Sequence, residues 1–459
     1  MQATFLIIGG GISGLSAAWQ AQLHGIPYTV LEADNRWGGK LQTVTHELEG
    51  GARFRLEAAA ESFITRKMDA YELAQELGLD DAILAQEAEA HGVGVLYRGE
   101  VHPMPTSAMA LARSRLLTWR GKLRLLAEPF IKTRKDDDDE TLAAFLARRL
   151  GQEASQRLFA PILGGIYHTD PHRQSVIVSA AHMRNLEYSY GSLFVGMLRS
   201  MWQTRKTSAL GIPRFIRFDG GTQTFVNALV AQLTGDLRLN APASSLSKHE
   251  EGYRVTLADG ETLFASHILL TTPAHVSAHL LASVAPASAE ALKGLPVSSI
   301  GTLFLGYRQQ DLPAQPPLVR ELMIPRTEGR TIDAVLWSSL RQPDSAPEGY
   351  ALLKVFFGSA RPDLIDASDE TLGVVAHEEL RSLFGLSAPP VFARAFRWKN
   401  SHPQADVEHI GRVIAINDNL PKSIALAGSP YYGAGVPNCV EHGRVAVDGL
   451  VYSIMDASS

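Results

Sequence analysis

A glycine-rich turn near the start of the chain lies between a short apolar run and a helical stretch. Residues 4–8 are apolar and largely β-branched, which is typical of a buried strand in a parallel sheet. Residues 9–14 follow with the spacing G-x-G-x-x-G, and an alanine-rich stretch then runs to about His24. A second apolar run, residues 28–31, ends at Glu32, eighteen residues after Gly14. This strand–turn–helix–strand order predicts a dinucleotide-binding unit.

Each glycine of the spacing in that turn has a separate physical task. Gly9 permits the tight turn, Gly11 lets a pyrophosphate approach the backbone, and Gly14 lets the helix pack closely on the strand. The helix N-terminus offers unpaired N–H groups and the positive end of a dipole to the phosphates. Glu32 is placed to accept a hydrogen bond from a ribose hydroxyl.

A second glycine pair follows Glu32 directly, in the segment Arg36-Trp37-Gly38-Gly39-Lys40. The pattern E-x-x-x-R-x-G-G resembles the motif of the FAD-dependent amine-oxidase superfamily. That resemblance implies that Arg36 and the backbone of the glycine pair line the pyrophosphate and flavin side of the cofactor. Rossmann-type NAD enzymes do not need this second turn, so the sequence favours FAD. The single cysteine, Cys439, lacks a recognisable flavin-linking context, so we expect the FAD to be noncovalent.

Length and composition exclude several classes of protein. The chain has 459 residues, enough for two or three domains. Its net charge of −5 gives no support for a nucleic-acid partner. One cysteine cannot form an intrachain disulfide, which fits a reducing cytoplasm. We find neither a secretory signal nor a run of some 18 apolar residues, so we expect a cytoplasmic protein, at most peripheral on the cytoplasmic face of a membrane.

The pattern of strands and helices predicts an α/β fold with a discontinuous cofactor domain. Residues 424–428 read as a strand that ends in glycine, and a glycine-rich turn then leads into a helix that begins near Asn438. This second helix N-terminus is another dipole site. We therefore expect a Rossmann-like FAD-binding domain from residues 1–65, 206–285 and 405–459, a mixed α+β substrate domain from 66–100 and 286–404, and a helical, membrane-associating subdomain from 101–205.

Within the helical subdomain, residues 107–135 combine an apolar stripe with basic flanks. Leu116, Trp119, Leu123 and Leu126 fall on one narrow helical face. The flanking cations are Arg113, Arg115, Arg120, Lys122 and Arg124. Basic side chains that border an apolar stripe suit a lipid surface, and they equally suit a surface helix that packs on its own core. Both interpretations stay open at this point.

Motifs spread over almost the whole chain resemble the oxygen-dependent, FAD-containing protoporphyrinogen oxidases and their bacterial relatives that oxidise coproporphyrinogen. Residues 61–67 are similar to the D-S-F-x-x-R-K of that family, and residues 148–151 to its R-R-x-G. Residues 161–167 resemble its P-L-x-x-G-I-Y segment, and residues 435–439 fit its closing G-x-x-D-C. The middle segments are specific to this branch of the superfamily.

The resemblance implies an activity and a set of cofactor contacts. It implies oxidation of protoporphyrinogen IX to protoporphyrin IX in haem biosynthesis, with coproporphyrinogen III as the alternative substrate. Flavin N5 is then the hydride acceptor, no side chain is assigned as catalytic, and O2 is the acceptor that yields hydrogen peroxide. The implied FAD contacts are Gly9, Gly10, Gly11, Ile12, Ser13, Gly14, Glu32, Ala33, Arg36, Gly38, Gly39, Lys40, Ala59, Ala60, Glu61, Ser62, Ala243, Gly428, Ala434, Gly435 and Val436.

A porphyrinogen needs a broad apolar pocket with a cationic anchor for its carboxylates. The wall candidates are Leu163, Ile166, Met323, Leu336, Trp337 and Phe356, each of which core packing also explains. Val93 stands where plant members of the family carry a propionate-binding arginine. We therefore expect Arg66 or Lys67 to serve as the anchor, with Lys67 preferred and with His91 and Arg98 as substitutes.

Other functions remain as alternatives. Flavin amine oxidases place a lysine where this chain has Gly301, which argues against that class. A carotenoid-type desaturase shares the cofactor motif but not the middle segment, and a flavin-binding scaffold without turnover is the non-enzymatic alternative. We expect no metal site, because His275 and His279 have no third ligand at useful spacing. A monomer and a homodimer are both compatible with the sequence.

Overall fold

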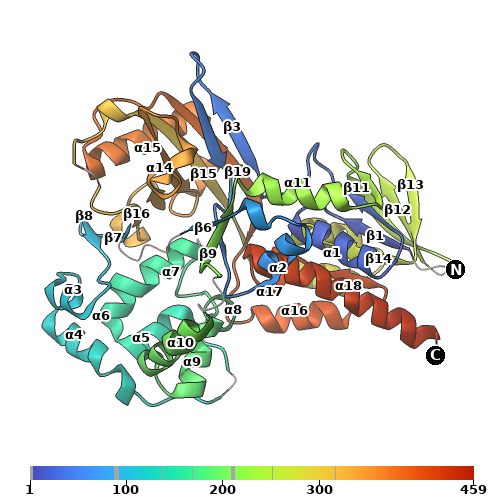
Figure 1. Cartoon of the computed structure of the whole chain (residues 1–459). Helices are drawn as coiled ribbons and strands as arrows, with labels where there is room; N and C mark the ends of the chain where they lie inside the picture. Colours follow the sequence, from blue (N-terminus) through green and yellow to red (C-terminus); the bar gives the residue numbers. More distant parts are fainter. Residues whose placement is uncertain are drawn as a thin grey trace.

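The computed structural model describes residues 4–86, 92–136, 138–167, 169–207, 212–250, 252–315 and 317–458. Three bodies are visible in Figure 1: a nucleotide-binding body at the right, a body built on a large sheet at the upper left, and a helical lobe at the lower left. Both chain ends lie at the right, in the nucleotide-binding body. The chain therefore leaves this body and returns to it, which confirms the predicted α/β fold with a discontinuous cofactor domain.

Five parallel strands carry the first glycine turn. From one edge of the sheet to the other they are β10 (Asp236–Arg238), β2 (Tyr28–Leu31), β1 (Phe5–Ile8), β14 (His267–Leu270) and β20 (Ile424–Leu426). All neighbouring pairs are parallel. Residues from the start, the middle and the end of the chain thus share one sheet, and their carboxyl ends meet at one edge.

The side chains of β1 alternate between two hydrophobic cores. Phe5 and Ile7 pack with helices α1 (Ile12–Leu23), α2 (Asp69–Glu76), α11 (Thr222–Gln232) and α18 (Val436–Ser458). Leu6 and Ile8 pack with helices α12 (Ala274–Leu281), α13 (Pro286–Lys293) and α16 (His409–Asp418), and with the antiparallel strands β11 (Ala243–His249), β12 (Gly252–Leu257) and β13 (Thr262–Ala265). Both faces of the sheet are covered, which explains why its central strands are continuously apolar.

The second body is a seven-stranded sheet. Its order is β19 (Phe392–Pro403), β15 (Val297–Arg308), β18 (Tyr350–Phe357), β17 (Ala334–Leu336), β16 (Glu321–Met323), β7 (Val93–Tyr97) and β8 (Glu100–Pro103). Only β16 and β7 run parallel among these neighbours. Helix α15 (Asp369–Phe384) packs on one face of the sheet, and the ribbon of β3 (Thr43–Glu47) and β4 (Arg53–Glu57) packs against side chains of the other.

A small three-stranded sheet lies against the nucleotide-binding body, with Phe63, Ile216 and Phe218 in the core of that body. It consists of β5 (Phe63–Ile64), β9 (Phe215–Phe218) and β6 (Ile83–Gln86). The start of the predicted substrate domain, residues 66–86, contains α2 and β6. Ala70, Leu73 and Leu77 pack in the core of α1 and α18, so this segment belongs to the nucleotide-binding body.

The helical lobe joins ten short helical segments around one core. They are α3 (Ala108–Arg113), α4 (Trp119–Leu126), η3 (Glu128–Phe130), α5 (Leu142–Leu150), α6 (Gln152–Ala154), the π-helical turn η4 (Ser155–Phe159), α7 (Ala160–Tyr167), α8 (Val176–Ser179), α9 (Ala181–Tyr190) and α10 (Leu193–Thr207). Thr118, Thr141 and Ser175 cap the N-termini of α4, α5 and α8 with their side-chain oxygens.

The apolar stripe expected on residues 107–135 lies at the surface of this lobe. Trp119 is 66% exposed, Leu123 57% and Leu126 61%, whereas Leu125 fills the core beneath α4. Helix α4 therefore packs on the core of its own lobe, but through Leu125 and not through these three residues of the stripe. Leu116, which precedes α4, is buried in the same core. Among the described residues, no helix has the length and apolar character needed to span a membrane.

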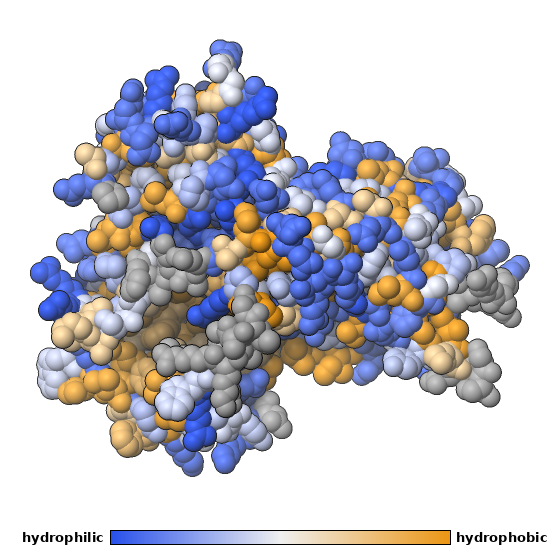
Figure 2. Space-filling view, in the orientation of Figure 1, coloured by the Kyte–Doolittle hydropathy of each residue, from blue (hydrophilic) through white to orange (hydrophobic). Residues whose placement is uncertain are grey.

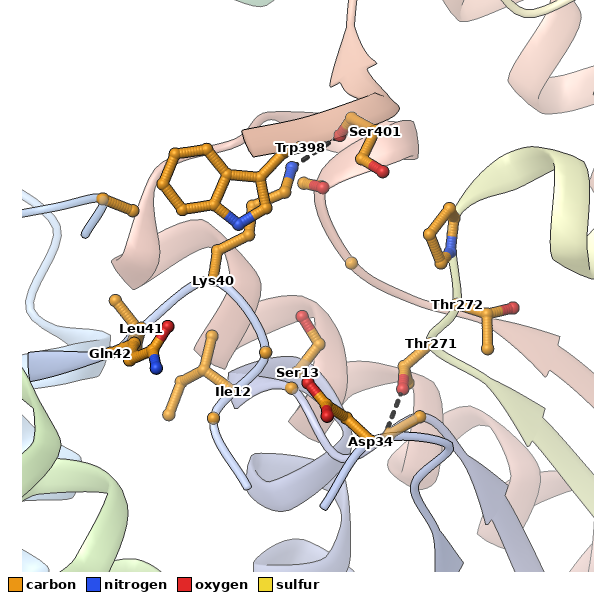
Figure 3. A pocket seen from close by; sticks show the side chains of 18 of the residues that line it. Ile12, Ser13, Asp34, Lys40, Leu41, Gln42, Thr271, Thr272, Trp398 and Ser401 are labelled. Carbon is orange, nitrogen blue, oxygen red and sulfur yellow. Dashed lines mark hydrogen bonds between the residues drawn. The ribbon is translucent and has the colours of Figure 1, made fainter. Parts of the chain in front are cut away.

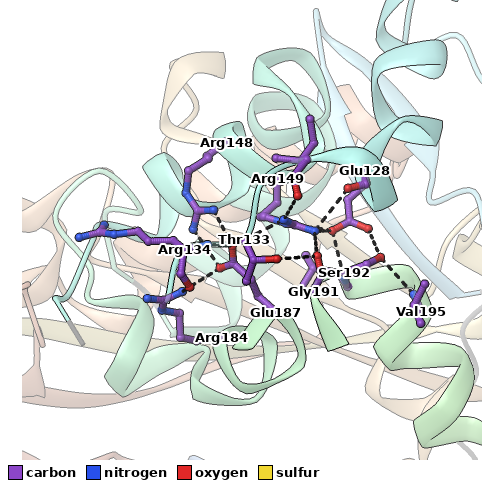
Figure 4. Close-up of polar contacts among 12 residues, drawn as sticks. Glu128, Thr133, Arg134, Arg148, Arg149, Arg184, Glu187, Gly191, Ser192 and Val195 are labelled. Atoms are coloured by element: carbon purple, nitrogen blue, oxygen red, sulfur yellow. Dashed lines mark hydrogen bonds and ion pairs between the residues drawn. The ribbon is translucent and has the colours of Figure 1, made fainter. Parts of the chain in front are cut away.

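A buried ion network fixes the helical lobe from within (Figure 4). Glu128 and Arg149 are both fully buried and paired with each other. Glu128 also accepts hydrogen bonds from Ser192 Oγ at 2.6 Å and from the backbone N–H of Leu193 at 2.9 Å, so it ties η3 to the start of α10. Burial alone would raise the pKa of Glu128, but these hydrogen bonds together lower it below its usual value.

Replacing Arg149 by methionine should destabilise the protein strongly. The variant leaves the buried Glu128 without its cation, and breaking a buried pair from one side costs about 3–5 kcal/mol. We expect a clear fall of the melting temperature in a calorimetric or fluorescence scan. Arg199→Met is the matched control, because Arg199 is exposed on α10 and only stacks on Tyr190. Equal melting temperatures for the two variants would contradict a structural role of the network.

Candidate functional site

A long cavity of about 1070 Å³ lies where the carboxyl ends of the parallel strands face β15 and β19 of the large sheet (Figure 3). Segments far apart in the sequence form its wall. They include the glycine turn after β1, the second glycine pair, the turn at Ala59 and Ala60, the Pro242–Ala243 step, and the start of α18. The volume lies just above the range of about 300–1,000 Å³ that is typical of ligand cavities.

The two glycine turns touch each other at the cavity. Gly11 and Gly38 form an isolated parallel bridge, and the N–H of Gly38 donates to Gly10 O at 2.8 Å. Gly38 has a φ of +103° and Gly39 a φ of +57°, conformations that side chains rarely adopt. A Cβ on Gly39 would lie 3.1 Å from the Cα of Gly11. The second pair is therefore glycine because the first turn lies against it.

Glu32 is held at the cavity wall by two backbone donors. Its carboxylate accepts from the N–H of Gly10 at 2.6 Å and from the N–H of Asp34 at 2.8 Å. Gly10 itself is not in the wall, and a Cβ there would meet the ring of Trp37 at 2.5 Å. Gly14 is also outside the wall. A Cβ on Gly14 would lie 1.9 Å from Gly9 O, so only glycine fits at this position. These two glycines shape the site without lining it.

Two cations of the second turn are largely taken out of water. The Arg36 guanidinium donates to Gly39 O and, at 3.3 Å, to Leu41 O, which braces the turn from inside. Lys40 Nζ donates to Ser401 O at 2.5 Å and so connects the turn to the end of β19, beside Trp398 (Figure 3). Burial lowers the pKa of both side chains.

The turn after β4 is anchored by a lysine that sequence reasoning did not single out. Lys354 on β18 is 1% exposed, and its Nζ donates to Glu57 O at 2.8 Å and to Ala59 O at 2.7 Å. The same ammonium lies 3.2 Å from a carboxylate oxygen of Glu61. Ala59 and Ala60 are in the cavity wall, whereas Glu61 and Ser62 are not. Glu61 therefore serves here as the counter-charge of the lysine.

The C-terminal part of the wall contains Gly428, Ala434 and Val436, but not Gly435. Helix α18 begins at Val436, two residues before the position expected from the sequence. The positive end of its dipole therefore lies at the cavity. Cys439, in the first turn of α18, also lies in the wall, and burial raises the pKa of its thiol.

The candidates for the substrate pocket fall in different places. Phe356 lies in the wall of the cavity. Met323, Leu336 and Trp337 are buried in the large-sheet body and do not line it. Leu163 is half-buried in α7, while the side chain of Ile166 lies outside the described part. A Cβ on Gly165 would meet Met323 Sδ at 2.7 Å, so α7 packs directly against β16.

The anchor candidates differ in their partners. Lys67 Nζ is 3.0 Å from Glu441 on α18, and both side chains are well exposed. Arg66 is exposed, and among the described residues no carboxylate lies within ion-pair distance of it. Burial lowers the pKa of His182 on α9, and the nearby charges of Arg66 and Arg214 lower it further. Arg98 stacks on Tyr97 at the β7–β8 turn, and His91 lies outside the described residues.

Several wall residues escaped sequence reasoning. Thr271, Thr272 and Pro273 follow β14 at the carboxyl edge of the sheet, where open α/β sheets bind their ligands. That rule would have identified them once residues 267–270 were recognised as a parallel strand. Gln42, Arg394 and His402 carry no comparable signal, because only the packing of the two sheets brings them to the cavity. No group of metal-ligating side chains occurs among the residues described.

Replacing Gly11 by leucine should abolish cofactor binding without unfolding the chain. Gly11 has an extended backbone, with φ −72° and ψ 175°, which any residue can adopt. The nearest atom to a Cβ there is 4.0 Å away, so the side chain would enter the cavity. We expect a colourless, folded protein by absorbance and circular dichroism. Gly411→Leu, at an exposed helical glycine with open space around it, is the control that should stay loaded.

Comparison with known proteins assigns almost the whole chain to one family. The model of the flavin containing amine oxidoreductases matches residues 12–451. A coproporphyrinogen III oxidase of Bacillus subtilis is 28% identical, with 97% of this chain and 98% of that protein covered. The chloroplastic protoporphyrinogen oxidase of Nicotiana tabacum is 27% identical, with 95% of this chain and 83% of that protein covered.

Solved structures agree in fold. A crystal structure from Exiguobacterium sp. 255-15, which carries a provisional protoporphyrinogen oxidase name, has a TM-score of 0.83 at 25% identity and 99% coverage of both chains. A cyclohexylamine oxidase of Brevibacterium oxydans has a TM-score of 0.71 at 18% identity, with 99% of this chain and 100% of that chain covered, and shares the fold. With the family model matching nearly the whole chain, this protein belongs to the flavin containing amine oxidoreductases.

Proposed function

We propose that this chain is an FAD-dependent enzyme that oxidises a porphyrinogen to a porphyrin. The observation that carries the proposal is full-length similarity to porphyrinogen oxidases, together with a cavity built from the two glycine turns. The large-sheet body argues against an amine oxidase. A side chain at residue 301 would meet the ring of Phe357 at 2.1 Å, so the lysine that amine oxidases carry there has no room.

The residues of the cavity fit a noncovalent FAD. Backbone N–H groups at the start of α1 and the space beside Gly11 suit a pyrophosphate, which carries no hydrogen to donate. Glu32 has lone pairs left to accept from a ribose hydroxyl. Ala243 and Pro242 offer an apolar edge for adenine, and burial raises the pKa of the Cys439 thiol, which disfavours the reactive thiolate. FAD held here supplies a two-electron acceptor, which no side chain of the protein can provide.

The protein itself contributes orientation and electrostatics. The first turn of α18 places the positive end of a helix dipole at the cavity, where it stabilises negative charge. Lys354 holds the turn at Ala59 through two carbonyl oxygens, and Lys40 holds the second glycine turn against β19. Phe356, Ile300 and Trp398 add apolar surface to the wall and exclude water from it.

Two substrates match the proposal, and one observation favours each. Protoporphyrinogen IX follows from the sequence motifs and from relatives such as the tobacco enzyme. Coproporphyrinogen III is supported by bacterial relatives, including one from Propionibacterium freudenreichii that is 28% identical with 99% of this chain covered. Coproporphyrinogen carries four propionates and protoporphyrinogen two. Arg66 and Arg214 both lie close enough to His182 to lower its pKa, and two neighbouring arginines suit the more highly charged substrate.

Side-by-side turnover of the two porphyrinogens under air tests the proposal. Porphyrin fluorescence should rise with both consumption of O2 and release of hydrogen peroxide, and we expect the higher kcat/KM for coproporphyrinogen III. A higher value for protoporphyrinogen IX would assign that substrate instead. Loaded flavoprotein that turns over neither compound would contradict the proposed function and leave a flavin scaffold or another oxidase.

The substrate anchor is proposed at Arg66 and Lys67. A propionate in an apolar cleft needs a cation, and both residues follow the turn that Lys354 holds. Arg66→Met or Lys67→Met should raise KM and lower kcat/KM about one to two powers of ten, which corresponds to a charge-assisted hydrogen bond of about 1.5–3 kcal/mol. FAD content should stay complete.

Glu441→Gln is the matched control for the anchor. It removes the partner of Lys67 and keeps the cation. The exposed pair contributes at most about 1 kcal/mol to stability, so this variant should fold and turn over at least as well as the wild type. Unchanged kinetics in both methionine variants would refute the anchor and direct attention to Arg98.

A peripheral membrane contact of the helical lobe is also proposed. The exposed stripe Trp119, Leu123 and Leu126 continues into Phe130, which is 89% exposed on η3, and η3 packs against α10. Figure 2 shows apolar residues among polar ones over the lower-left lobe, where Figure 1 places α3 and α4. Cations such as Arg120, which stacks on Trp119, border this face and complement an anionic bilayer.

Charge reversal should weaken vesicle binding. Each basic residue near an anionic surface contributes about 1 kcal/mol before screening, so Arg113, Arg120 and Lys122 changed together to Glu should lose more than about a hundredfold in partition coefficient. High salt should weaken the wild type in the same direction. The control reverses three exposed lysines of the nucleotide-binding body, Lys248, Lys293 and Lys422. Equal partitioning of the two triple variants would contradict a contact through this face.

A further inference from the structure

A second pocket lies on the helical lobe, far in sequence from the cofactor motifs and between the end of β8 and α3. It has a volume of about 440 Å³, and its wall includes His102, Pro103, Met104, Arg113, Ser114 and Arg115. We propose that this pocket binds the phosphate of an anionic phospholipid headgroup when the lobe lies on a membrane. The inference rests on the membrane contact proposed above and adds a specific site to it.

The polar groups of the pocket are suited to a phosphate. Arg113 and Arg115 are exposed, and among the described residues neither has a carboxylate within ion-pair distance. The Ser114 hydroxyl oxygen accepts from the N–H of Leu116 at 3.2 Å, which leaves its O–H hydrogen to donate. Arginine forks bind phosphate oxygens in pairs and with higher directionality than lysine does.

Among the described residues, Glu100 is the carboxylate that pairs with a wall residue of the pocket. Glu100 lies 3.8 Å from His102 Nε2, and its side chain is 75% exposed, so the distance is too long for a hydrogen bond and solvent screens the charge. The two guanidinium groups therefore dominate the charge at the pocket. A negatively charged ligand is favoured there over a neutral or cationic one.

The surroundings of the pocket distinguish a lipid from a free phosphate. Pro103, Met104 and Ala110 give the pocket an apolar lining next to its two arginines. Met109, which lies next to Ala110 on α3, is 61% exposed. The exposed apolar residues from Trp119 to Phe130 follow within a few residues. A free phosphate has no use for an apolar border. A phospholipid has both parts, a phosphate at the level of the arginines and acyl chains at the level of the exposed apolar residues.

The test compares two double variants that remove the same charge. Arg113→Gln/Arg115→Gln empties the pocket of its cations, whereas Arg120→Gln/Lys132→Gln removes two exposed cations of the same lobe outside it. Binding is measured to vesicles of phosphatidylcholine with phosphatidylglycerol, and to phosphatidylcholine alone. On the anionic vesicles we expect the pocket variant to bind about tenfold more weakly than the control variant, because it loses paired hydrogen bonds in addition to charge.

A soluble headgroup gives the second measurement. sn-Glycerol 3-phosphate should bind the wild type and not the pocket variant, in calorimetry or by protection of the arginines from phenylglyoxal. FAD content, melting temperature and porphyrinogen turnover in detergent should be equal in all three proteins, because Arg113 and Arg115 lie outside the cofactor cavity.

The outcomes separate the pocket from the membrane contact itself. Equal losses in the two double variants would overturn the headgroup site and leave a nonspecific membrane contact. Binding of glycerol phosphate without any difference between the variants on vesicles would assign a free-phosphate site instead. A wild type that binds no vesicle would overturn the membrane contact and this inference together, while the turnover assay would still report on the porphyrinogen oxidase.

Discussion

The close crossing of the first and the last long helix determines the form of this molecule. A Cβ on Gly443 of α18 would lie 2.2 Å from Ser13 O of α1, so the two backbones meet with no side chain between them. Arg444, the next residue, donates to Gln20 on α1 at 3.0 Å and pairs with Glu76 on α2 at 2.9 Å. Because α18 is fixed against α1, its N-terminus reaches the same cavity as the first glycine turn, although more than four hundred residues separate them.

Two buried lysines join the nucleotide-binding body to the large-sheet body across the cavity. The cavity runs between them, so its wall needs connections that do not fill it. Lys40 supplies one from the nucleotide-binding body to Ser401 at the end of β19, and Lys354 supplies one in the opposite direction, to Glu57 O and Ala59 O. Both ammonium groups are buried and satisfied by carbonyl oxygens, and a buried cation of this kind is costly to displace. They hold the turns at the cavity more rigidly than apolar contacts alone.

Local sequence rules predicted the parts of the site that depend on backbone geometry. The strand at residues 4–8, the turn with Gly9 and Gly11, and Glu32 at the end of the next strand follow from periodicity and spacing, and the structure has a strand at Phe5–Ile8 that leads into the turn. The parts of the site that depend on the packing of distant segments could not be predicted from the sequence. Lys354 looks like one residue of an apolar strand, and Trp337 looks like a cavity wall but fills the core beside Phe384. The position of α2 could not be predicted for the same reason. An apolar face indicates that a helix packs on something, but it does not identify the element on which the helix packs.

The helical lobe carries exposed apolar residues that its own core does not use. Its fold is stabilised by the core around Phe145 and Leu146 and by the buried pair of Glu128 and Arg149, all of them inside the lobe. Trp119, Leu123 and Phe130 contribute little to that core, since more than half of each side chain meets solvent. Single exposed apolar residues are ordinary, but several on one short segment bordered by cations are less so. The core and the buried ion pair of the lobe do not use these residues, so their exposed place fits the membrane contact proposed above.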